Sequence, residues 1–89
     1  MDLNHNYLGK IYVSLKPTVN DPQGLAVQGS LRALGFESIL EVRVGKFVEI
    51  SLVASNQQEA ERLIDSMCQR LLANPVIERY TFEVLQLKS

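Results

Sequence analysis

The sequence predicts an α+β fold, a two-layer sandwich with the element order β-α-β-β-α-β and two helices on one face of an antiparallel sheet. Segments in which apolar and polar residues alternate indicate strands with one buried face. Two segments with apolar residues at helical spacing lie between them, and each follows a residue that caps helices well. Each half of the chain therefore reads strand, helix, strand, an order typical of two-layer α+β folds.

The first strand is expected at residues 10–16, where apolar side chains occupy every second position. It should end at Pro17, which has no N–H to donate to a sheet. Residues 1–9 are mostly polar and are expected to form a flexible tail. A single domain then covers residues 10–89. His5, the only histidine, is expected to be a solvated tail residue, because a metal site needs three or four ligands.

The first helix is expected to begin after Asp21, a favourable N-cap, with Pro22 at its first position. Gly35 should end it in the left-handed conformation. Gly24 and Gly29 weaken a helix, so each needs a reason. One reason is close packing of the helix on the sheet, and the other is a surface that a second chain approaches closely. The sequence leaves both open.

The second helix is expected to begin after Asn56, with Glu59 completing a capping box, and to run to about Ala73. The pair Asn74-Pro75 should stop it. Cys68 lies beside the apolar stripe of this helix and has no partner base in the sequence. It is therefore expected to pack in the core rather than to act as a nucleophile.

A β-hairpin with its turn at Gly45 is expected between residues 39 and 53. The face pattern places Val44 opposite Val48, whereas turn chemistry favours Val44 opposite Phe47. A one-residue bulge near Phe47 reconciles the two registers. The face pattern is the stronger constraint, because a slip by one residue would move every side chain to the other face.

The last strand is expected at residues 76–87, a span of roughly 40 Å at 3.3 Å per residue. A domain of this size has a radius of gyration of about 12 Å, so this strand should bend, bulge or run beyond its own sheet. The sheet face away from the helices should carry several apolar residues that together mark an interface. These are Ile39, Phe47, Val53, Leu85 and Leu87. The expected core comprises Ile11, Val13, Leu15, Leu31, Leu34, Val42, Val44, Ile50, Leu52, Leu63, Met67 and Leu71.

Composition narrows the function classes. The 89 residues are 46% hydrophobic with a net charge of −1, and no basic run is present, which argues against nucleic-acid or membrane-surface binding. One cysteine forbids an internal disulfide, and a cytoplasmic location is expected. No phosphate-binding loop, metal-ligand spacing or catalytic triad is visible. Glu41 and Glu49 are expected to be solvated or paired with basic neighbours rather than catalytic. The residues alone therefore indicate a small interaction module.

Four short segments occur in order along the chain. They are Ile11–Pro17, Asp21–Gly24, Val42–Lys46 followed by Glu49, and Leu72–Glu78. In sequence and spacing they resemble the PurS family, the small subunit of phosphoribosylformylglycinamidine synthase, over about residues 10 to 85. The predicted fold is then a ferredoxin-like or PurS-like variant that forms oligomers.

The resemblance implies a role in purine biosynthesis, as a non-catalytic subunit of an ATP-dependent ligase with glutamine as amide donor. The family member is expected to be a homodimer or dimer of dimers and an adaptor between a synthase large subunit, PurL, and a glutaminase subunit, PurQ. It would help ammonia reach the synthase. ATP and Mg are expected on the large subunit and no cofactor on this chain. The alternative from the fold alone is a domain that senses an amino acid or nucleotide at a dimer interface.

Three loops are expected to supply most of the partner contacts, since loops present backbone and side-chain groups that a partner can read. Their residues are Asp21, Gln23, Gly24, Arg43, Gly45, Lys46, Asn74 and Pro75. The same residues also have local duties, because they cap a helix, form a turn and stop a helix. The sequence does not decide between these two roles.

Overall fold

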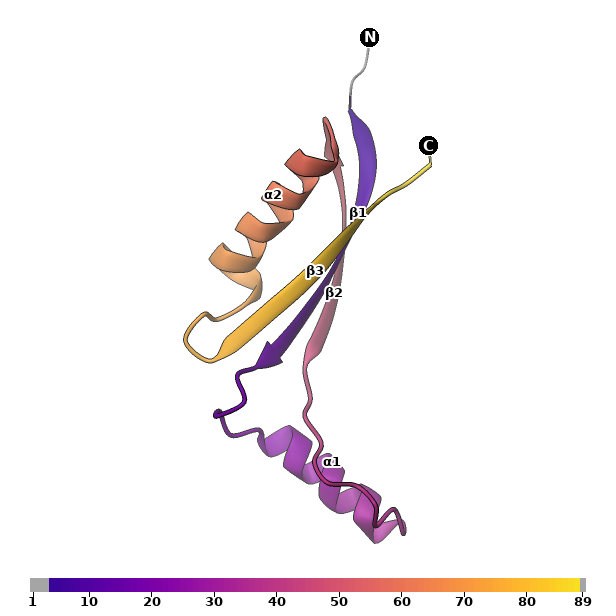
Figure 1. Cartoon of the computed structure of the whole chain (residues 1–89), viewed down its shortest axis with the longest axis vertical. Coiled ribbons are helices and arrows are strands. Elements are labelled where there is room, and N and C mark those ends of the chain that lie inside the picture. Colours follow the sequence, from indigo (N-terminus) through magenta and orange to yellow (C-terminus); the bar gives the residue numbers. More distant parts are fainter. Residues whose placement is uncertain (1–3, 89) are drawn as a thin grey trace.

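The computed structural model describes residues 4–88, which form a three-stranded antiparallel sheet and two helices (Figure 1). The elements in order are β1 (His5–Leu15), α1 (Pro22–Ala33), β2 (Lys46–Ala54), α2 (Gln57–Met67), a π-helical turn η1 (Cys68–Leu72) and β3 (Glu78–Gln86). The predicted α+β class and the antiparallel sheet are confirmed.

β1 is the central strand of the sheet, whose order is β2-β1-β3. Ile11 lies opposite Val48 of β2 and Phe82 of β3. β1 begins at His5, so residues 5–9 belong to the sheet and the predicted tail is wrong for them; residues 1–3 lie outside the described residues. The tail prediction missed Tyr7, which is only 2% exposed because it points into the core.

The predicted central hairpin does not form. β2 pairs with β1 rather than with residues 39–44, so neither predicted register of Val44 exists and the order becomes β-α-β-α-β. Side chains of α1 and of its N-cap accept hydrogen bonds from backbone N–H groups that a hairpin would have used for strand pairing. The N–H of Val44 donates to Asp21 Oδ2 at 2.8 Å, and the N–H of Val42 donates to Gln28 Oε1 at 3.3 Å. Alternating apolar residues in 39–44 therefore lie in an irregular connection.

Both helices start where the sequence predicts. Asp21 Oδ1 accepts a hydrogen bond from the Gly24 N–H at 2.9 Å, and Asn56 Oδ1 accepts one from the Glu59 N–H at 2.8 Å. The Glu59 carboxylate reaches back to Ser55 rather than to the cap itself. η1 continues α2 to Leu72, close to the predicted end.

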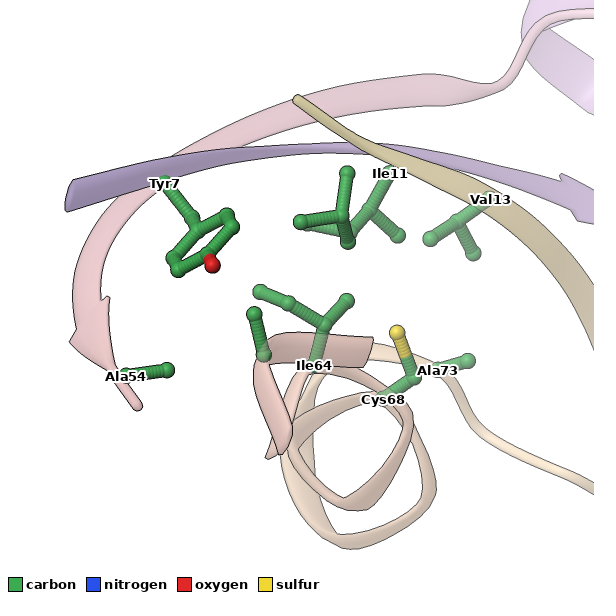
Figure 2. Packing of buried hydrophobic residues seen from close by; sticks show 9 residues of the cluster. Tyr7, Ile11, Val13, Ala54, Ile64, Cys68 and Ala73 are labelled. Carbon is green, nitrogen blue, oxygen red and sulfur yellow. The ribbon is translucent and has the colours of Figure 1, made fainter. Parts of the chain in front are cut away.

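The core lies between the sheet and α2. Figure 2 shows Tyr7, Ile11 and Val13 of β1 facing Ile64 of α2 and Cys68 at the start of η1. The nine buried members are Tyr7, Ile11, Val13, Ala54, Ala60, Ile64, Cys68, Ala73 and Val84. Cys68 is fully buried, as predicted. Four further predicted core residues pack partly buried against this cluster: Ile50, Leu52, Leu63 and Met67.

The other expected core residues lie outside this cluster. Leu71 lies on the exposed side of η1, and the rest are in or near α1, which does not cover the sheet. Figure 1 shows α1 beyond the end of the sheet, so only α2 packs on the sheet face. Leu34 is 75% exposed and Leu71 83% exposed, so both core predictions are wrong. Leu15, Leu31, Val42 and Val44 are half-buried without joining the cluster. The protein is elongated as a result, with a radius of gyration of 17.4 Å and extents of 60 × 28 × 14 Å.

Within residues 4–88, neither helix combines the length and the apolar character that crossing a bilayer requires.

Candidate partner-binding site

The three loops singled out by the sequence meet at the end of the sheet nearest α1. Asp21 binds the backbone of Val44, as described above. Lys16 Nζ donates to the Pro75 carbonyl at 2.7 Å, and Lys46 Nζ lies 3.9 Å from Glu78 Oε2. We refer to Lys16, Asp21–Gly24, Arg43–Lys46 and Asn74–Arg79 together as the sheet-end site.

Asp21 holds two of these loops together. Its carboxylate accepts one hydrogen bond from the Val44 N–H and one from the Gly24 N–H, and the residue is 5% exposed. These two hydrogen bonds, the one from Val44 above all, lower the pKa of Asp21 below its ordinary value of 3.8, and the nearby Arg43 charge adds to the effect. The side chain is therefore committed inside the chain and has little capacity left for a partner.

Two glycines of the site allow close backbone approaches. A Cβ on Gly24 would lie 2.4 Å from the Val42 carbonyl oxygen, and one on Gly45 would lie 2.5 Å from the Val13 carbonyl oxygen. Gly24 therefore permits close packing, although against the 42–44 connection rather than against the sheet. At Gly29 a Cβ would meet nothing within 4 Å, so close packing within residues 4–88 does not explain this glycine.

Arg43 fastens the connection before β2 to the loop after β1. Its Nη2 donates to the Lys16 carbonyl at 3.1 Å and to the Val19 carbonyl at 2.9 Å. The Lys16 N–H in turn donates to the Ile77 carbonyl at 2.8 Å. The loop that contains Pro17 is thus hydrogen-bonded both to the connection before β2 and to the turn before β3.

The Asn74–Glu78 turn is closed by its own hydrogen bonds. Asn74 Oδ1 accepts from the Val76 N–H at 3.0 Å, and Glu78 Oε1 accepts from the Asn74 N–H at 2.7 Å. Pro75 and Val76 are left exposed at the tip of the turn. These two residues present an apolar corner to solvent.

The predicted site residues therefore divide into two groups. Asp21, Gly24, Arg43 and Gly45 join different segments of the chain. Gln23, Lys46, Asn74 and Pro75 are exposed, and the side chains of Lys46 and Asn74 interact with the 74–78 turn. Lys16, Glu78 and Arg79 also belong to the site and were not predicted. Their only signal is indirect: Lys16 and Glu78 fall within the four family-like segments, and Arg79 follows the last of them.

Two further ionisable side chains, Tyr80 and Cys68, have raised pKa values. Tyr80 Oη donates to Asp65 Oδ1 at 2.6 Å, and this hydrogen bond raises the pKa of Tyr80. Burial, with a smaller contribution from Asp65, raises the pKa of the Cys68 thiol and keeps it protonated at neutral pH. Residues 4–88 contain no group of three potential metal-ligating side chains.

Comparison with known proteins agrees with this arrangement. The family model of PurS, described as phosphoribosylformylglycinamidine (FGAM) synthase, matches residues 9–86. The chain is 45% identical to phosphoribosylformylglycinamidine synthase subunit PurS of Synechocystis sp., over 97% of this chain and 86% of that protein. It is also 45% identical to the same subunit of Bacillus subtilis, over 88% of this chain and 92% of that protein.

Solved structures share the fold along almost the whole chain. Thermus thermophilus PurS superimposes with a TM-score of 0.84 at 44% identity, covering 93% of this chain and 99% of that one. A chain in the structure of PurLQS from Thermotoga maritima superimposes with a TM-score of 0.80 at 30% identity, covering 92% and 98%. The sheet-end site lies within residues 9–86, which the family model matches.

Proposed function

Because the chain belongs to the PurS family of phosphoribosylformylglycinamidine synthase subunits, we propose that it is the non-catalytic adaptor of that enzyme in purine biosynthesis. It would join the synthase subunit to the glutaminase subunit and support the transfer of glutamine-derived ammonia between them. The observation that carries this proposal is the family match over residues 9–86, which includes every loop of the sheet-end site. The likeness to a chain of PurLQS supports PurL and PurQ as the partners.

We assign the chemical steps of the complex to the two larger subunits. ATP and Mg would bind the large subunit, and the location would be the cytoplasm. In support, polar side chains within residues 4–88 already form internal hydrogen bonds: Asp21 holds two loops together, Asn56 caps α2, and Tyr80 donates to Asp65. No comparison favours the alternative of a sensing domain. Calorimetry with amino acids and nucleotides would detect one, since a pure adaptor should bind neither.

A homodimer or dimer of dimers is part of the proposal. The sheet face opposite α2 exposes Tyr12, Phe47, Val53 and Leu85, and the Tyr12 and Phe47 rings stack with centroids 5.0 Å apart. A two-fold interface uses the same patch on both subunits. This face supplies two apolar groups, Tyr12 with Phe47 and Val53 with Leu85, separated by the charged row of Glu49, Lys10 and Glu83. Apolar and charged groups on one face are suited to such pairing.

We assign partner contact to the sheet-end site. Gln23, Lys46, Asn74 and Pro75 would touch a partner through exposed side chains. Asp21, Gly24, Arg43 and Gly45 would hold the loops in position, and Arg43 does so through Nη2 alone, which leaves the rest of its guanidinium free for a partner. This division follows because the second group joins α1, β1 and the connection before β2, through the hydrogen bonds of Asp21 and Arg43 and the close approaches at Gly24 and Gly45. Both roles that the sequence left open are then used, by different residues.

Reconstitution tests the proposal. Lys46→Ala should change the free energy of unfolding by no more than about 0.5 kcal/mol, as is usual for surface changes. It should lower the glutamine-dependent rate of the reconstituted complex and spare the rate with ammonia supplied directly. Arg70→Ala, which changes an exposed basic residue of η1, is the matched control. Failure of the unaltered chain to co-purify with the two larger subunits would refute the adaptor role itself.

A further inference from the structure

A hollow of about 330 Å³ at the sheet end is lined by residues from three segments of the chain, three of them charged. Arg43 and Glu41 come from the connection before β2, Arg79 from β3 and Ser14 from β1. Ser14 and Arg79 lie opposite each other in the sheet, on the face away from α2. Within residues 4–88, neither Arg79 nor Glu41 has a side-chain hydrogen bond or ion pair.

The two arginines differ in how firmly they are held. Arg43 is fixed by its two hydrogen bonds to backbone carbonyls, both made through Nη2. A guanidinium has five N–H donors, so Nε and Nη1 stay available. Arg79 is exposed and unpaired in the described residues. One positioned guanidinium and one adjustable guanidinium therefore face the same hollow.

We propose that this hollow binds a carboxylate side chain of another subunit of the synthase complex, gripped between Arg43 and Arg79. Arginine forks match carboxylate oxygens and can bind both at once. The Ser14 hydroxyl supplies one more donor. This inference rests on the proposed function, since it needs a partner subunit at the sheet end.

The charge of the hollow selects a monoanion. The two guanidinium groups and the Glu41 carboxylate that line the hollow sum to one positive charge, and the Asp21 carboxylate near Arg43 reduces the positive charge further. A phosphate group carries nearly two negative charges at neutral pH and would meet Glu41 as a like charge. The hollow therefore suits an aspartate or glutamate side chain better than a phosphorylated ligand.

The exposure of the hollow favours a carboxylate carried by a protein over a free one. Ion pairs at exposed sites are weak and screened by salt, so they would hold a small carboxylate poorly. The same group on a partner subunit is presented at high effective concentration by the rest of the interface. Lys46 and Pro75, exposed at the same end of the sheet, offer further surface to such a partner.

Charge reversal at Arg79 tests the proposal in the reconstituted complex. Arg79→Glu should weaken binding to the larger subunits about tenfold or more at low salt, because like charges then face each other in the interface. Arg79→Lys should keep part of the affinity. The matched control is Arg62→Glu, which reverses an exposed arginine of α2 in a different hollow. Equal affinities of Arg79→Glu and the unaltered chain would overturn the proposal while leaving the adaptor role intact.

Zero-length cross-linking identifies the occupant. In the Arg79→Lys variant, a carbodiimide should couple position 79 to an aspartate or glutamate of a larger subunit, located by mass spectrometry. Coupling to Glu41 of the same chain, or to a second copy of this chain, would overturn the assignment. If the unaltered chain binds neither larger subunit, the proposed function fails as well, which a failure of the cross-link alone does not imply.

Discussion

The two helices are of similar length but relate to the rest of the chain in different ways. α2 lies on the sheet, and Ala60, Ile64 and the adjoining Cys68 are fully buried. Figure 2 shows Ile64 and Cys68 facing β1. α1 lies beyond the sheet, and among its residues only Gly24 is buried. Leu25 and, just after the helix, Leu34 are mostly exposed. Apolar burial attaches α2, whereas hydrogen bonds and close backbone approaches attach α1.

This difference separates stability from assembly. The apolar contacts that favour folding lie between α2 and the sheet, since burial of apolar surface is the dominant favourable term. The α1 region is positioned through the Asp21 carboxylate and the Arg43 guanidinium, so its apolar side chains stay available to other chains. Changes in the two regions should therefore affect different measurements.

The largest effect is expected in the α2 region. Ile64→Ala should lower the free energy of unfolding by about 2–5 kcal/mol, because it empties a fully buried position. Leu34→Ala is the matched control in the α1 region and should stay within about 0.5 kcal/mol in the isolated chain. Urea denaturation followed by circular dichroism at one protein concentration measures both. Equal losses would show that α1 is as much a part of the core as α2.

A smaller effect is expected where α1 meets the 42–44 connection. Gly24→Ala should destabilise the chain by about 1–3 kcal/mol, because the added Cβ would lie 2.4 Å from the Val42 carbonyl oxygen and the backbone must shift. Gly29→Ala has open space and should stabilise α1 by up to about 1 kcal/mol. The same denaturation measurement compares the two variants. A gain in stability from both would contradict a close approach at Gly24.

The contrast between the helices also explains what the sequence could predict. Helix starts were predictable because Asp21 and Asn56 act on groups three residues away, and such local rules need no knowledge of the tertiary structure. The alternation in β1 was read correctly from Lys10 onward. Helix packing was not predictable for α1, because its spacing of apolar residues is the same whether the stripe faces a sheet or solvent.

The prediction of a central hairpin was wrong for a related reason. Residues 39–44 alternate like a strand, yet the Val42 and Val44 N–H groups bond to Gln28 and Asp21, which lie at least 14 residues earlier. Local pattern does not reveal such long-range competitors for backbone hydrogen bonds. The sheet-end site was predictable in part, because its punctuation residues have visible local roles. Arg79 has no such local role, and only the pairing of β3 with β1 places it beside Ser14.

The smallest change in the free energy of unfolding at neutral pH is expected from Asp21→Asn. Asparagine is also a good N-cap, so the substitution removes chiefly the hydrogen bond from the Val44 N–H. Its pH dependence is the sharper test. The pKa of Asp21 is lowered in the folded chain, first by the hydrogen bond from Val44 and then by that from Gly24. A lowered pKa stabilises the folded state at pH values above the ordinary pKa of 3.8, and this contribution is lost as the pH falls through the folded pKa.

The unaltered chain should therefore be more stable than Asp21→Asn at pH 7, and the difference should shrink below about pH 3.8. Denaturant unfolding of both chains over this pH range measures it, and the difference between the two cancels the titration of the other carboxylates. A constant difference would mean that Asp21 does not stabilise the folded chain through its charge.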